Sequence, residues 1–289
     1  MAAMPSSIDE LLSLLDLEPI EECLFRGRHP ETSLQRVFGG QVASQALVAA
    51  ARTADVDRVV HSLHAYFLRP GDTKVPIVYD VERTRDGRSF STRRVVARQH
   101  GRPIFYMSAS FQVPEDGLDH QDPMPPVAPP LECPELGDVL AGLTGRPRDD
   151  WDREWASLDV RYAGDSRAGG ALHDDRHPAL ARVWLKASGP IGDDPVLHAA
   201  VLTYASDLTL LSATVVPHDT YIGDPRLQPA SLDHAMWFHR PLRADEWLLY
   251  DQVSPSASGG RGFATGRLFT VDGRLVATAV QEGLVRLRA

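Results

Sequence analysis

Residues 64–70 read HAYFLRP, and residues 234–241 read HAMWFHRP, which is the same pattern with one residue added. Three further matches follow in the same order along the chain: Tyr79-Asp80 with Tyr250-Asp251, Arg88-Ser89-Phe90 with Arg261-Gly262-Phe263, and Gly101-Arg102 with Gly273-Arg274. The matched positions are separated by 170 to 173 residues throughout. Ordered matches at a nearly constant separation indicate an internal repeat. The sequence therefore predicts a duplicated module.

Each copy of the repeat predicts one apolar helix followed by an antiparallel meander. In the first copy, residues 75–81, 90–98 and 104–111 read as strands separated by turns that contain glycine. The helix candidates, at about residues 40–52 and 195–211, are rich in small or apolar side chains that let a sheet approach closely. Asp194 and Pro195 indicate the start of the second one, as an N-cap followed by proline at the first helical position. A long sheet wrapped around one central helix is the hotdog arrangement. We therefore expect an α+β fold, a double hotdog made of two tandem modules.

A proline-rich stretch separates the two copies. Seven prolines fall between residues 114 and 134, and this density removes too many backbone donors for a helix or a central strand. The expected domains are an N-terminal helical segment (1–22), a first hotdog (23–113), a linker (114–150) and a second hotdog (151–289).

The N-terminal segment contains a short amphipathic helix. Residues Ser7 to Glu10 have the S-x-x-E pattern of a capping box. The apolar face that follows consists of Ile8, Leu11, Leu12 and Leu15. We expect this helix to dock on the rest of the protein.

Composition and charge exclude several classes of protein. The 289 residues are 43% hydrophobic and 24% charged, which is ordinary for a globular protein. The net charge of −9 disfavours nucleic-acid binding, which depends on excess positive charge. No apolar run approaches the roughly 20 residues of a membrane span, and no secretory or peroxisomal signal is visible. We expect a cytoplasmic protein that uses no metal or organic cofactor, because clustered Cys/His ligands and a nucleotide fingerprint are both absent from the sequence.

Three polar residues fall where the predicted fold has its core. Asp207 lies in the second central helix among leucines, and a buried carboxylate there costs several kcal/mol unless it is hydrogen-bonded. Gln281 follows an apolar run in the last strand, and Ser231 is expected to open the strand that continues through residues 232–238. Taken alone, each of these residues fits a buried polar side chain whose hydrogen bonds are all made within the core. Together they indicate a site.

At this point the sequence resembles the acyl-CoA thioesterase II family of double-hotdog enzymes. The motifs that carry the resemblance span nearly the whole chain: FRG at 25–27, VFGGQ at 37–41, HSLHAYFLRPGD at 61–72, YASD at 204–207, DHAMWFHRP at 233–241 and VQEG at 280–283. The resemblance implies an acyl-CoA substrate and a catalytic set of Asp207, Ser231 and Gln281. Some members of the family have Thr where this chain has Ser231, and both residues provide a hydroxyl.

The resemblance also implies how such a site works. Ser231 and Gln281 would hold a water molecule, and Asp207 would orient it or accept its proton. Backbone N–H groups at the start of the first central helix, around Gly39, Gly40 and Gln41, are candidates for the oxyanion hole. Members commonly form dimers or tetramers, and we expect a homodimer or homotetramer, with apolar residues of the strand at 180–185 left exposed for association.

Two alternative functions remain open at the level of the sequence. A hotdog enoyl-CoA hydratase would need an Asp and His pair in one site. Asp233 and His234 are adjacent, and neighbouring residues of a strand point to opposite faces, which disfavours that pair. A non-catalytic acyl-CoA binding or sensing protein is distinguished only by activity.

Overall fold

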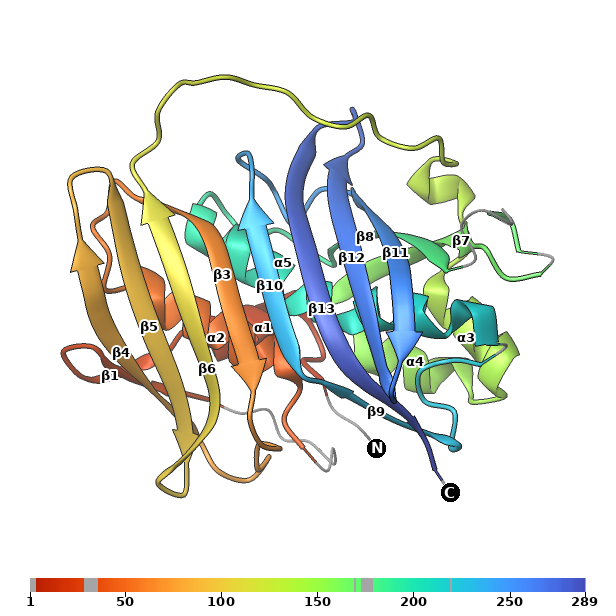
Figure 1. The fold of residues 1–289 in the computed structure, drawn as a ribbon, viewed down its shortest axis with the longest axis horizontal. Helices are drawn as coiled ribbons and strands as arrows, with labels where there is room; N and C mark the ends of the chain where they lie inside the picture. Colours follow the sequence, from red (N-terminus) through yellow and green to blue (C-terminus); the bar gives the residue numbers. More distant parts are fainter. Residues whose placement is uncertain (1–3, 29–35, 169, 173–178, 219, 289) are drawn as a thin grey trace.

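The computed structural model describes residues 4–28, 36–168, 170–172, 179–218 and 220–288 (Figure 1). The helices are α1 (Ile8–Leu15), α2 (Gly39–Ala51), α3 (Leu136–Thr144), α4 (Arg148–Trp155) and α5 (Pro195–Thr209), with two 3₁₀ segments, η1 (Pro130–Glu132) and η2 (Leu210–His218). The strands are β1 (Glu18–Glu21), β2 (Leu24–Gly27), β3 (Val59–Phe67), β4 (Ile77–Asp86), β5 (Phe90–Gln99), β6 (Arg102–Gln112), β7 (Leu158–Asp165), β8 (Leu180–Ala187), β9 (Leu227–Ser231), β10 (Asp233–Phe238), β11 (Leu248–Ser258), β12 (Arg261–Thr270) and β13 (Leu275–Leu287).

These strands form one antiparallel sheet with the order β1-β2-β4-β5-β6-β3-β10-β13-β12-β11-β8-β7, and β9 pairs with the end of β13. The two copies of the repeat join where β3 pairs with β10, with Ala65 opposite His234. Each copy contributes an antiparallel meander on its own side of this junction. The predicted duplication and the double hotdog are therefore confirmed.

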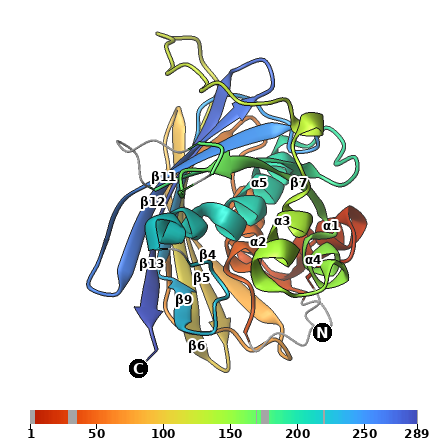
Figure 2. The ribbon, with the colours of Figure 1, turned by 90° about the vertical axis from the view of Figure 1, so that its right-hand side faces the viewer.

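The two central helices pack side by side on the same face of the sheet (Figure 2). Ala43, Ala46 and Ala49 of α2 are fully buried, and their small side chains allow close packing. The helix α5 begins as predicted, with Asp194 Oδ1 accepting a hydrogen bond from Val196 N at 2.9 Å. Together α5 and η2 (Pro195–His218, 24 residues) are long and apolar enough to cross a membrane, but 89% of their most apolar window is buried inside the protein. Their apolar character therefore fits a core helix.

The N-terminal helix α1 packs against both α2 and α5. Ser7 Oγ accepts a hydrogen bond from Glu10 N at 3.1 Å, as the capping box predicts. The residues of α1 that are buried are Ile8, Leu11, Leu14 and Leu15. Leu12, also expected on the apolar face, is half-buried and packs against the same core, and Leu14 is a further buried residue that the expected face did not include. Gln45 Nε2 of α2 donates to the Leu14 carbonyl at 2.7 Å, which holds the last turn of α1 against the central helix.

The linker runs from the end of β6 over the upper ends of the strands in Figure 1, and it packs against the second half of the sheet on the face opposite the central helices. Up to Pro129 it contains neither helix nor strand, and α3 lies wholly in the later part of the predicted linker. Gln121 Nε2 donates to the Gly273 carbonyl at 2.7 Å, and Trp184 Nε1 donates to the Ala128 carbonyl at 2.9 Å. The linker thus covers apolar side chains of β8, β11 and β12.

The strand at residues 180–185 differs from the expectation. It belongs to β8, which is paired on both edges, by β7 and by β11. Leu180 and Leu185 are buried, and the linker covers Trp184 of the same strand. The prediction that this strand exposes apolar residues for association is therefore wrong, because β7 and the linker cover it within the chain.

Gly266 of β12 supplies a test of how tightly the second half is packed. A Cβ at this position would overlap Cε2 of the fully buried Tyr250. We predict that Gly266→Ala lowers the free energy of unfolding by about 1–3 kcal/mol, because the tyrosine ring must move in a filled core. Urea unfolding measures the change. The control is Gly142→Ala in α3, where nothing lies within 4 Å of the added Cβ and no loss is expected. Equal stability of the two variants would contradict the prediction.

Candidate active site

Three polar side chains predicted from the sequence meet at one carboxylate. Asp207 lies in the last turn of α5, Ser231 at the end of β9 and Gln281 in β13. Ser231 Oγ donates a hydrogen bond to Asp207 Oδ1 at 3.0 Å, and Gln281 Nε2 donates to the same oxygen at 2.5 Å. Asp207 and Gln281 are buried, and Ser231 is partly buried. The structure therefore brings all three residues together.

The local position of Ser231 differs from the expectation. It ends β9 and does not open the strand that continues to Phe238. The break falls at Leu232, whose N–H donates to the Glu282 carbonyl while its own carbonyl accepts from Phe67 N. The chain changes partner here, because β9 pairs only with β13, whereas β10 pairs with both β13 and β3. This break sets Ser231 beside the end of α5.

The start of α2 reaches the same carboxylate. Phe38 is the N-cap of α2 and makes no side-chain capping bond, and the Gly40 N–H donates to the Asp207 carboxylate. Asp207 therefore caps a helix of the other copy, where the helix dipole favours a negative charge. A Cβ on Gly39 would lie 2.7 Å from Asp207 Oδ2, so the close approach requires glycine. The Gln41 side chain points elsewhere, since its amide donates to the Arg28 carbonyl at 3.4 Å.

Burial raises the pKa of Asp207 to about 6, and the hydrogen bonds from Gln281, Ser231 and Gly40 oppose this rise. The carboxylate is thus mostly ionised at neutral pH and is a stronger base than an exposed aspartate. Gln281 Oε1 is buried and has no hydrogen-bond partner among the described residues. An unpaired acceptor next to a basic carboxylate is suited to holding a polar reactant.

The pair considered for a hydratase does not form a site. Asp233 Oδ1 accepts a hydrogen bond from Glu282 N at 2.6 Å, whereas His234 points into the core and lies 2.8 Å from Ser206 Oγ. The two side chains lie on opposite faces of β10, as the alternation of a strand requires. Within the described part of the chain, no histidine is hydrogen-bonded to Ser231, so a Ser-His nucleophile is not formed.

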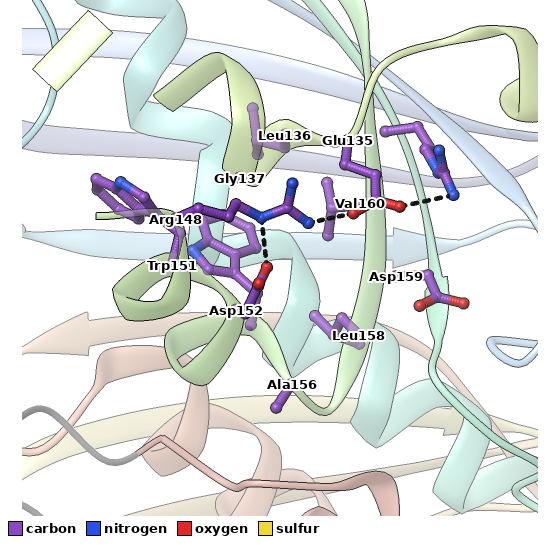
Figure 3. Close-up of a pocket in the computed structure, with 12 residues that line it drawn as sticks. Glu135, Leu136, Gly137, Arg148, Trp151, Asp152, Ala156, Leu158, Asp159 and Val160 are labelled. Carbon is purple, nitrogen blue, oxygen red and sulfur yellow. Dashed lines mark hydrogen bonds and ion pairs between the residues drawn. The ribbon is translucent and has the colours of Figure 1, made fainter. Parts of the chain in front are cut away.

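A surface pocket lies elsewhere, between α3, α4 and β7 (Figure 3). Its walls carry an ion-pair network in which Arg148 contacts Glu135 and Asp152. None of the residues predicted for the site lines this pocket. In the described ranges, no group of three or more His, Cys, Asp or Glu side chains has the arrangement of a metal site.

Comparison with known proteins assigns the family. Models of the acyl-CoA thioesterase N-terminal domain and of acyl-CoA thioesterase match residues 28–112 and 166–284. Acyl-CoA thioesterase 2 of Haemophilus influenzae is 38% identical over 98% of this chain and 99% of its own length, and human acyl-coenzyme A thioesterase 8 is 42% identical over 96% and 88%. The crystal structure of acyl-CoA thioesterase II TesB2 from Mycobacterium marinum has a TM-score of 0.83 and 47% identity, covering 96% of this chain and 99% of that chain.

The chain therefore belongs to the acyl-CoA thioesterase family. The resemblance inferred from the sequence motifs is confirmed, and with it the assignment of the chain as a thioester hydrolase acting on acyl-CoA.

The raised pKa of Asp207 predicts a specific pH dependence of stability. Because the pKa is about 6 in the folded protein and 3.8 for a free side chain, the folded state binds the proton more tightly than the unfolded state. The resulting stabilisation is present below pH 4 and is lost as the pH rises through about 6. Asp207→Asn removes this titration, so its stability relative to wild type should rise by about 2 kcal/mol between pH 4.5 and pH 7.

Urea unfolding of both proteins at the two pH values measures this difference, because other titrating groups cancel in the comparison. A constant difference between variant and wild type would show that the carboxylate has the same pKa in both states.

Proposed function

We propose that this chain hydrolyses acyl-CoA by direct attack of a water molecule, which Ser231 and Gln281 position and from which Asp207 accepts a proton. The observation that supports the proposal most strongly is the convergence of both side chains on a buried carboxylate whose pKa is about 6. A base with a pKa close to the working pH is effective in proton transfer.

The reaction follows from this arrangement. Asp207 accepts one proton of the water as its oxygen bonds to the thioester carbonyl carbon, and the carbonyl oxygen becomes an oxyanion. The oxyanion lies at the N-terminus of α2, where N–H groups and the helix dipole stabilise negative charge. The Gly40 N–H is bonded to Asp207, so we assign this role to the N–H groups of Gly39 and Gln41. The carbon–sulfur bond then breaks, and the proton held by Asp207 passes to the coenzyme A sulfur, giving a carboxylic acid and a free thiol.

The function is tested by the release of free thiol from a series of acyl-CoAs from short to long chain, in buffer that contains a metal chelator. Hydrolysis should proceed, because the proposed mechanism uses no metal and no organic cofactor. A binding or sensing protein would retain acyl-CoA without releasing thiol. Loss of hydrolysis in chelator, restored by one metal, would contradict the cofactor-free mechanism.

We predict that Asp207→Ala and Gln281→Ala each lower kcat by at least about 10²-fold, the scale for a positioned base or hydrogen-bond donor. Ser231→Thr should keep much of the activity because the hydroxyl is retained, whereas Ser231→Ala should lose it. Steady-state kinetics and circular dichroism check activity and folding together. Near-normal turnover of a folded Asp207→Ala or Gln281→Ala variant would remove that residue from the mechanism.

We also propose that the protein assembles as a homodimer or homotetramer. The support is the outer face of the first half of the sheet, where Tyr66 of β3 is 51% exposed and its ring packs in a tilted arrangement against Tyr106 of β6. A symmetric dimer is the commonest closed assembly. Light scattering should give at least twice the chain mass of 31.8 kDa. A value equal to the chain mass at micromolar concentration would show a monomer.

We further propose a cytoplasmic enzyme of fatty acid metabolism. Both cysteines are free thiols, Cys23 partly buried and Cys133 buried. Unpaired cysteines are typical of proteins in a reducing compartment.

A further inference from the structure

His234 occupies a core position where the other copy of the repeat has leucine. Arg69 and Arg240 lie 171 positions apart, as do Tyr79 and Tyr250, and the same separation relates Leu63 to His234. The sequence pattern alone pairs His64 with His234, but His64 is exposed whereas Leu63 and His234 are buried, so Leu63 is the structural counterpart. Leu63 and His234 are both fully buried. An aliphatic side chain therefore satisfies this position of the fold, and the imidazole of the second copy requires a separate explanation.

The contacts of His234 lead directly to the catalytic helix. His234 Nε2 lies 2.8 Å from Oγ of Ser206, the residue that precedes Asp207. Ser206 Oγ has a single proton, which it donates to the Thr203 carbonyl at 2.9 Å, so the imidazole Nε2–H is the donor to the hydroxyl. Burial lowers the pKa of His234 to about 4, which keeps the ring neutral at neutral pH. Nδ1 has no partner among the described residues, so the ring makes one hydrogen bond there, and that bond holds Ser206.

A second strand holds the same residue through its backbone. Tyr250 Oη donates to the Ser206 carbonyl at 3.2 Å. The equivalent tyrosine of the first copy, Tyr79, donates to Gln45 Oε1 at 2.7 Å on its own central helix. A tyrosine thus links helix to sheet in both copies, whereas the histidine link occurs only in the copy that carries Asp207.

The hydrogen bond between His234 and Ser206 is important because α5 changes geometry just beyond Ser206. The helix ends at Thr209 and continues as the 3₁₀ segment η2, so Asp207 lies in a last turn where regular helical hydrogen bonds cease. The hydrogen bonds of Asp207 to Ser231 and Gln281 depend on how this turn is held.

We propose that His234 is a positioning residue, which acts through the Ser206 hydroxyl to hold Asp207 within hydrogen-bond reach of Ser231 and Gln281. The inference rests on the proposed role of Asp207. A displacement of about 1 Å at a reacting group can lower the rate by 10²-fold, so a residue that never touches substrate can control kcat.

The principal test replaces His234 with the leucine of the other copy. His234→Leu should fold, since Leu63 fills the equivalent position, and it should lower kcat by about 10-fold or more with KM little changed. His234→Gln carries an N–H close to the position of Nε2 and should recover part of the lost kcat. Ser206→Ala removes the other partner, so the double variant His234→Leu/Ser206→Ala should be no slower than the worse single variant.

Two further measurements separate positioning from general stability. The hydrogen bonds from Ser231 and Gln281 lower the pKa of Asp207, so weakening them should move the acidic limb of the pH profile, set near pH 6 by Asp207, to higher pH in His234→Leu. The groups that face Asp207 are Ser231, Gln281, the Gly40 N–H and the Tyr250 ring, and His234 itself titrates well below this limb. As a matched pair, Tyr250→Phe should lower kcat, whereas Tyr79→Phe loses a similar buried hydrogen bond and should not.

Wild-type kcat in folded His234→Leu and Ser206→Ala would overturn the proposal. The proposal would also be overturned if His234→Leu and His234→Gln had equal kcat and the acidic limb of the pH profile did not move. His234 would then have a structural role only. If His234→Leu does not fold, the kcat values of Ser206→Ala and His234→Gln test the proposal instead, because these substitutions make smaller changes to the core. Failure of the proposed function has a different result, since Asp207→Ala would then be active whatever the His234 variants show.

Discussion

The buried carboxylate of Asp207 is the constraint on which the centre of the molecule depends. An ionised group in a core costs several kcal/mol unless donors satisfy it, and here three donors do so. They come from Ser231 of β9, Gln281 of β13 and the Gly40 N–H of α2. Since α2 belongs to the first copy and the other elements to the second, separating the copies would remove one of the three donors to the carboxylate and leave the N-terminus of α2 without its cap. The hydrogen bond from the Gly40 N–H therefore adds a polar contact between the two hotdogs to the β3–β10 pairing and the packing of α2 on α5.

The two copies have diverged while keeping the same scaffold. A buried tyrosine ties each central helix to the sheet, Tyr79 in the first copy and Tyr250 in the second. The first copy contributes the Gly40 N–H and two glycines, of which Gly39 permits close approach to Asp207 and Gly40 permits close approach to the Tyr204 carbonyl. The second copy contributes the polar side chains. Each buried polar side chain needs its own hydrogen-bond partners, and a single site needs only one set of such side chains. The polar side chains of this site are therefore found in one copy only.

The halves also differ in what covers the outer face of the sheet. Over the second half, the linker covers a cluster that includes Trp184, Leu249 and Phe269, and backbone carbonyls of the linker accept hydrogen bonds from strand side chains. Its prolines suit this role, because an extended chain with few backbone donors leaves few unsatisfied groups against an apolar surface. The outer face of the first half retains exposed aromatic rings, among them Tyr66.

The duplication, the start of α5 after Asp194 and the selection of Asp207, Ser231 and Gln281 as unusual polar residues all follow from the sequence alone. These features are recorded locally, in caps, in periodicity and in polar residues among apolar neighbours. Other features follow from the tertiary structure alone: the break at Leu232 after Ser231, the pairing of β8 on both edges, the burial of Leu14 in addition to the predicted face of α1, and the capping of α2 by Asp207. Each of these depends on pairing between distant segments, such as the 74 residues that separate Asp207 from Gln281. Local patterns record whether a residue is buried, but the identity of its partners is set by strand register and helix packing, which no single segment contains.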